Sequence, residues 1–131
     1  MNDQSLLNEF QIYRGRMAQF RTWNNRPEDW EERWGNSIQA VIDQHRGGYL
    51  GEFEIFTKYI SRQSLTLEAG CGDGHLVAAL RARGYKVEGV DFDQGTINKI
   101  HAIVPDLSVR VGDVYKLDVP NHYYGGYISL G

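Results

Sequence analysis

At Leu65-Thr66-Leu67-Glu68-Ala69-Gly70-Cys71-Gly72-Asp73-Gly74-His75-Leu76, a short apolar run gives way to the start of an amphipathic helix. Three glycines at alternate positions, Gly70, Gly72 and Gly74, occupy the junction. Because glycine has no Cβ, the backbone there can adopt positive φ angles and come close to a bound molecule. The segment therefore predicts a strand, a ligand-binding loop and a helix, in that order.

Downstream of this segment, apolar runs alternate with helical segments of about ten residues, which is typical of βαβ units and a parallel sheet. Asp73 is expected to cap the first helix and Asp93 the second, which ends at Pro105; Gly84 suits the position after the first helix. The strands are expected at residues 65–69, 86–90, 107–111 and 123–130.

The first 62 residues have a different pattern, which predicts helices. Their apolar residues recur at steps of three and four, as on one face of a helix: Leu6, Phe10, Tyr13, Met17 and Phe20. Further stripes of this spacing carry Trp30 and Trp34, then Ile38, Val41 and Ile42, then Tyr49, Phe53, Phe56 and Ile60. The expected fold is an α/β, Rossmann-like open parallel sheet over residues 63–131, preceded by an all-helical extension over residues 1–62.

Composition excludes several classes of function. The 131 residues carry a formal net charge of −3, with acidic and basic residues interspersed, so no electrostatic footprint for nucleic acid or an anionic membrane is present. The single cysteine, Cys71, excludes an intrachain disulfide and a multi-cysteine zinc site, and we expect no metal cofactor. No segment has the character of a signal peptide or a membrane span, so a cytoplasmic protein is expected.

The glycine loop does not suit a dinucleotide. In the pattern G-x-G-x-x-G the third small residue falls on His75 or Val77, depending on the register, and no Gly-Lys-Ser or Gly-Lys-Thr follows for a Walker loop. Glu68 and Asp91 come at the ends of neighbouring strands, which predicts a pocket there, and the carboxyl group of Glu68 beside the loop would repel phosphates. The spacing favours a cationic ligand without phosphate, and an NAD(P)-dependent oxidoreductase remains the disfavoured alternative.

Four successive motifs resemble those of class I S-adenosylmethionine-dependent methyltransferases, in order and in spacing, over residues 64–131. They are Leu67–Gly74, Val87–Asp93, Gly112–Val114 and Tyr127–Gly131. The resemblance implies S-adenosylmethionine as cofactor, S-adenosylhomocysteine as product, and a sheet in which the first strand is central with the fourth beside it. One departure is Gly126, because the family usually has an acidic residue near that point.

The resemblance also implies a set of cofactor-binding residues. The three glycines would line the methionine part, and Glu68 belongs to the same motif. Asp91 would accept from the ribose hydroxyls, and Asp113 would bind the adenine amino group. Each has a structural alternative: a tight turn for the glycines and for Cys71, a helix cap for Asp91 and turn chemistry for Asp113. The full set is Glu68, Gly70, Cys71, Gly72, Gly74, Asp91, Phe92, Asp113 and Val114.

The acceptor is not specified by the sequence, and none of the four histidines is assigned a catalytic role. We expect a small-molecule acceptor, with the aromatic N-terminal segment as a lid that includes Tyr13, Trp30 and Trp34. Because the chain stops at Gly131, directly after an apolar strand, we expect the first half of a longer enzyme. A homo-oligomer, formed through the exposed fourth strand or the N-terminal helices, is expected. A non-catalytic, self-associating domain is the second alternative.

Overall fold

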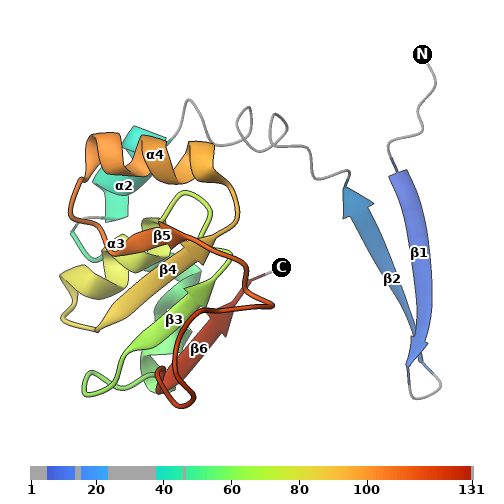
Figure 1. Ribbon diagram of the computed structural model, residues 1–131. Coiled ribbons are helices and arrows are strands. Elements are labelled where there is room, and N and C mark those ends of the chain that lie inside the picture. Colours follow the sequence, from blue (N-terminus) through green and yellow to red (C-terminus); the bar gives the residue numbers. More distant parts are fainter. Residues whose placement is uncertain (1–5, 14–15, 24–37, 46, 131) are drawn as a thin grey trace.

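The computed structural model describes residues 6–13, 16–23, 38–45 and 47–130 (Figure 1). Its main body is a four-stranded sheet with helices packed on it. In the part of the chain that is described, no helix is long and apolar enough to cross a membrane.

All four strands of the sheet are parallel: β3 (Thr66–Ala69), β4 (Val87–Asp91), β5 (Val109–Val111) and β6 (Gly126–Ser129). The spatial order is β5-β4-β3-β6. The first strand of the α/β segment is therefore central, with the fourth beside it, as the sequence predicts. The direction of strand progression reverses between β3 and β6, and ligands bind outside the carboxyl ends of strands at such a reversal.

The helices that connect these strands are α3 (His75–Ala82) and α4 (Gln94–Ile103). Because β3, β4 and β5 follow one another in a single direction, right-handed crossovers place both helices on the same face of the sheet. Their buried side chains form one core with residues from α2 (Ile38–His45) and with Leu50. The core includes Ile38, Ile42, Leu76, Val77, Leu80, Val87, Ile97, Ile100, Val109 and Ile128.

Residues before the sheet thus contribute to the core of the α/β body. The helical segment expected around Phe53 and Phe56 is the 3-10 helix η1 (Gly51–Lys58), in which their rings stack at a centroid distance of 5.9 Å. Phe53, Phe56 and Ile60 pack against the core. On the opposite face of the sheet a smaller cluster is covered by the connection between β5 and β6; it contains Leu67, Ala69 and Val90, with Val114, Leu117 and Tyr124.

At the ends of α3 and α4 the structure confirms two of the three predicted helix-end residues and corrects the third. The side chain of Asp93 accepts a hydrogen bond of 2.9 Å from Thr96 N–H, so it caps α4 as expected. Gly84, with φ of 84°, follows α3 as expected. Asp73 is not the N-cap of α3; that position is Gly74, in the left-handed conformation. Asp73 lies one residue earlier and accepts at 3.1 Å from the N–H of His75, the first helical residue.

The prediction of a helix over residues 6–23 is wrong. Within this range the structure describes two antiparallel strands, β1 (Leu6–Tyr13) and β2 (Arg16–Trp23), with Phe10 opposite Gln19 and Ile12 opposite Met17. Leu6 and Phe10 of the expected stripe are four residues apart, a spacing that fits one face of a helix and also alternate positions of a strand. The expected second helical segment, with Trp30 and Trp34, lies outside the described residues.

Candidate functional site

The glycine loop leaves β3 through a series of left-handed turns. Gly70, Gly72 and Gly74 have φ angles of 76°, 53° and 76°, a region that side chains with a Cβ rarely adopt. The backbone N–H groups of Gly70 and Cys71 both donate to the carbonyl of Val90, at 2.8 and 3.1 Å. The loop is therefore held against the carboxyl end of β4.

Asp91, the last residue of β4, joins the loop to the neighbouring strands. Its Oδ2 accepts from Gly72 N–H at 2.9 Å, and its Oδ1 accepts from Asp93 N–H at 3.0 Å. Its carbonyl accepts from Gly112 N–H at 2.9 Å, which brings the end of β5 alongside. Each carboxylate oxygen has a second lone pair for a ligand hydroxyl. The structure thus brings Gly72, Asp91 and the segment that leads to Asp113 together at one edge of the sheet.

Gly89, in the middle of β4, makes this loop position possible and is not among the predicted residues. A Cβ at Gly89 would lie 2.7 Å from Cβ of Cys71 and 2.9 Å from Cγ2 of Val77. Cys71 is buried against this glycine, and burial raises the pKa of its thiol. Cys71 therefore acts as a small residue that packs the loop onto the sheet. A glycine inside a strand is the signal that predicts such close approach of backbone.

The glycines of the loop differ in what surrounds them. Gly70 is exposed, and a Cβ there would meet nothing within 4 Å. A Cβ at Gly74 would instead lie 3.2 Å from Cδ2 of Leu107 and 3.4 Å from Cδ1 of Ile100. Gly70 thus borders open space at the surface of the loop, whereas Gly74 packs toward α4 and the segment before β5.

Glu68 is the most unusual residue of the site. It lies on β3 on the face that α3 covers, in register with Gly89 and Ile128, and is only 3% exposed. Its carboxyl group accepts a hydrogen bond from the backbone N–H of Val77, but Oε2 has no partner among the described residues. Burial, together with the nearby carboxyl groups of Asp73 and Asp91, raises the pKa of Glu68 to about 8. An orphaned buried oxygen of this kind indicates a place for a donor or a cation.

The remaining predicted residues lie around the same edge. Phe92 follows Asp91 and is 53% exposed, so its ring is accessible beside the end of β4. Asp113 is exposed, and its Oδ1 accepts from Tyr115 N–H at 2.9 Å in a turn after β5. Val114 packs against the smaller cluster on the opposite face of the sheet. The residues present fit a nucleoside-like cation: exposed backbone at Gly70, acceptors at the strand ends and an aromatic face.

A second feature that sequence reasoning did not single out is the pair of Asp73 and His75. Asp73 is buried, and its Oδ1 contacts Nδ1 of His75 as well as the His75 N–H. The ring of His75 also lies 5.7 Å from that of Phe53. Through these contacts the pair links the glycine loop to η1. The sequence indicates the pair only by an aspartate placed two residues before a histidine at the start of a helix.

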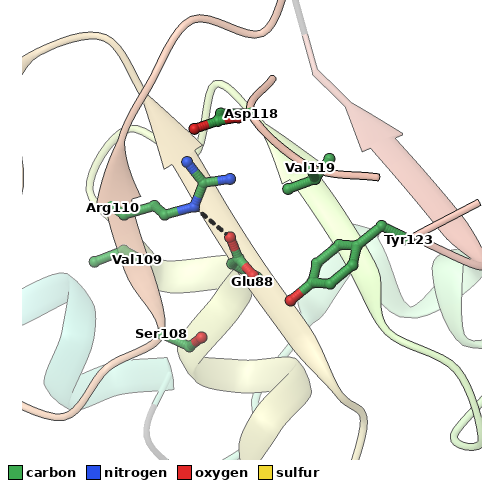
Figure 2. A pocket seen from close by; sticks show the side chains of 7 residues that line it. All are labelled: Glu88, Ser108, Val109, Arg110, Asp118, Val119 and Tyr123. Carbon is green, nitrogen blue, oxygen red and sulfur yellow. Dashed lines mark hydrogen bonds and ion pairs between the residues drawn. The ribbon is translucent and has the colours of Figure 1, made fainter. Parts of the chain in front are cut away.

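An open pocket of about 410 Å³ lies elsewhere, on the face of the sheet opposite α3. Figure 2 shows Arg110 and Glu88 pointing toward one another, with the ion pair of 2.5 Å between Nε and Oε1. The hydroxyl of Tyr124 also donates to Glu88, at 3.1 Å. None of the lining residues belongs to the predicted cofactor set; they are Glu88, Ser108, Val109, Arg110, Asp118, Val119 and Tyr123.

Comparison with known proteins agrees with the fold and with the order of the motifs. The family model of the methyltransferase domain matches residues 66–131. A protein of Mycolicibacterium smegmatis (strain ATCC 700084 / mc(2)155), described as a probable S-adenosylmethionine-dependent methyltransferase, is 33% identical over 55 residues. The match covers 42% of this chain and 21% of that relative's length. With a parallel sheet in the expected order and a glycine loop at its central strand, the chain belongs to the methyltransferase-domain family.

Proposed function

We propose that this chain carries the cofactor-binding part of an S-adenosylmethionine-dependent methyltransferase. The observation that supports this most is the meeting of Gly72, Asp91 and the Gly112 segment at the carboxyl ends of three adjacent strands. The name of the Mycolicibacterium relative points to the same cofactor. When bound, S-adenosylmethionine supplies a methyl group already activated on a sulfonium.

Different residues of the site would bind different parts of this cofactor. Gly70 and Gly72 would lie against the methionine part, since a backbone without Cβ permits close approach. Asp91 would accept from the ribose hydroxyls, for which a carboxylate is a suitable bidentate partner. Phe92 would lie against the adenine, and Asp113 and Val114 would bind its edge.

Electrostatics favour this cofactor over a dinucleotide. Three carboxyl groups, from Glu68, Asp73 and Asp91, surround the loop closely enough to influence one another. A sulfonium and an ammonium group are favoured next to them, whereas a pyrophosphate is repelled. Methyl transfer then depends mainly on the relative position of the two reactants, which can supply about 7–11 kcal/mol of the barrier reduction.

Calorimetric titration with S-adenosylhomocysteine and, separately, with NADH tests the proposal. We expect saturable binding of one S-adenosylhomocysteine per chain, and no heat of binding with NADH. Binding of NADH without a response to S-adenosylhomocysteine would favour an oxidoreductase and contradict the proposal. Because the test measures binding, it does not depend on the part of the enzyme that selects the acceptor.

We propose that the methyl acceptor is a small molecule. We also propose that the protein is cytoplasmic. The net charge of −3 supports this, since binding of nucleic acid relies on clusters of basic residues. Methyl incorporation from labelled S-adenosylmethionine into small molecules and into RNA, compared in one cell extract, is the test. Label that appears mainly in RNA would contradict the proposal.

We also propose that two copies associate through β6. This strand is an edge of the described sheet and pairs only with β3 there, and its Tyr127 is exposed. An exposed edge presents unpaired N–H and C=O groups to another chain. Light scattering at micromolar concentrations should give a dimer mass that Tyr127→Lys lowers; a monomer mass for the unaltered chain would contradict it.

A further inference from the structure

The carboxyl groups around the glycine loop differ in how well they are compensated. Asp91 accepts two backbone N–H groups, one on each oxygen. Asp73 accepts the His75 N–H and contacts its ring nitrogen. Glu68 has one backbone bond, from Val77, and its Oε2 has no partner among the residues described. A negative charge is therefore least stabilised at Glu68.

We propose that Glu68 is protonated in the ligand-free protein and releases its proton to the solvent when S-adenosylmethionine binds at the glycine loop. Cofactor binding is then coupled to pH through a group that lies beneath the loop rather than on its surface. This inference rests on the proposed function, because it requires a cationic ligand at the same site.

The two carboxyl groups that face Glu68 favour its protonated form, whereas the N–H of Val77 favours the ionised form. The carboxyl groups are Asp73 from the loop and Asp91 from the end of β4, and the buried thiol of Cys71 lies beside them. From α3, His75 lies against Asp73, and Val77 provides only its N–H. From β6, the neighbour in register is the apolar Ile128. Because no cationic side chain acts on Glu68 among the described residues, burial and like charge raise its pKa to about 8.

A bound cation reverses this balance. A sulfonium and an ammonium group near the loop favour the ionised carboxylate, since an opposite charge at short range lowers the pKa of an acid. The proton on Glu68 leaves to the buffer, and the carboxylate that remains compensates the ligand's positive charge. By linkage, the affinity for S-adenosylmethionine then rises with pH, by up to about tenfold for each pH unit below about 8.

Calorimetry of the unaltered chain in two buffers of different ionisation enthalpy measures the released protons directly. At pH 7 we expect release of close to one proton for each S-adenosylmethionine bound. 5′-Methylthioadenosine, which has the adenosine but neither cationic group, should bind at saturating concentration without release. Equal release with both ligands, or none with S-adenosylmethionine, would overturn the inference.

Glu68→Gln supplies the matched variant, because the amide has the shape of the protonated acid and cannot ionise. We expect it to bind S-adenosylmethionine within about threefold of the unaltered chain at pH 6 but about a hundredfold more weakly at pH 9. Glu88→Gln makes the same change on β4, on the opposite face of the sheet beside Arg110, and should leave the pH dependence of affinity unaltered. An unaltered pH dependence in Glu68→Gln would contradict the inference.

Carbon-13 NMR of labelled glutamate carboxyl groups keeps the inference testable if Glu68→Gln does not fold. In the unaltered, ligand-free chain, one glutamate should titrate well above the others and ionise at pH 7 when S-adenosylmethionine is added. If S-adenosylhomocysteine and S-adenosylmethionine both bind while every glutamate titrates in the ordinary range, the inference fails and the proposed function stands. If neither binds, both fail.

Discussion

The carboxylate of Asp91 accepts a hydrogen bond of 2.9 Å from the backbone N–H of Gly72, across the gap between β4 and the glycine loop. Its second oxygen accepts from Asp93 N–H, at the start of the following helix. One side chain thus fixes the loop after β3 relative to the helix after β4. The loop is held in place before any ligand arrives, which lowers the cost of ordering it on binding.

Asp91→Asn removes the charge and one of the two acceptors. We expect a loss of about 1–3 kcal/mol in the free energy of unfolding, since one backbone N–H loses its partner. The affinity for S-adenosylhomocysteine should fall by at least about tenfold, as for a lost charged hydrogen bond. Denaturant unfolding and calorimetry measure the two effects. Asp118→Asn, at the pocket on the opposite face, is the control and should change neither.

Gly89→Ala tests the close approach between β4 and the loop. The new methyl group would meet Cβ of Cys71 at 2.7 Å, so the loop must shift, at a cost of about 1–3 kcal/mol in stability. Gly95→Ala is the matched control, because a Cβ there meets nothing closer than the carboxylate of Asp93 at 3.8 Å. Thermal unfolding of both variants is the measurement. Equal melting temperatures would show that the loop does not pack on Gly89.

Gly70→Ala separates strain from steric exclusion of the ligand. Both Gly70 and Gly84 have positive φ, so alanine at either should cost about 1–2 kcal/mol in stability. Gly70 borders open space at the loop, whereas Gly84 follows α3 near Arg62. We therefore expect Gly70→Ala to weaken S-adenosylhomocysteine binding and Gly84→Ala to leave it unaltered. If both variants lost affinity for S-adenosylhomocysteine to the same extent, the loss would result from lower stability and not from contact between Gly70 and the ligand.

The stability of the ligand-free chain should fall as pH rises from about 4.5 to 8. In that window the folded state holds a proton on Glu68 that the unfolded state releases, because its pKa is 4.5 in a model compound and about 8 in the fold. Folding therefore binds a proton, and raising the pH opposes it. A shift of one pKa unit corresponds to about 1.4 kcal/mol, so Glu68 changes the free energy of unfolding by at most about 5 kcal/mol across this pH window.

Urea denaturation at a series of pH values measures this slope. Glu68→Gln should remove it, so the variant gains stability relative to the unaltered chain as the pH approaches 8. Glu88→Gln, whose partner Arg110 is on the next strand, should retain the slope. A Glu68→Gln variant with the same slope as the unaltered chain would contradict the assignment of the proton to Glu68.

The parts of the fold that the sequence predicts correctly are those with strong local signals. Asp93 and Gly84 have the chemistry of helix ends, and short apolar runs between helices require a parallel sheet. The N-terminal segment has no such signal. The spacing of Leu6, Phe10 and Met17 fits a helix and a hairpin equally, so only pairing between the strands decides.

For the site, residue type and order identify the loop and Asp91, but not how the residues are buried. Asp73 has the chemistry of a cap, yet the left-handed turn at Gly74 moves the helix start by one residue. The raised pKa of Glu68 depends on its burial under α3 and on two carboxyl groups distant in sequence or across the loop. The sequence shows Gly89 as a glycine inside a strand, but not that Cys71 is the residue that packs against it. These properties arise from packing, which spacing alone does not encode.

Backbone amide NMR shifts on addition of S-adenosylhomocysteine test the central claim most directly, because they locate the ligand on the fold. The account predicts that the largest shifts fall on the glycine loop and the strand ends: Gly70, Gly72, Asp91, Phe92 and Asp113. Ser108 and Arg110, at the pocket on the opposite face, should not move. Shifts concentrated at that pocket, or no shifts at saturating ligand, would contradict the account.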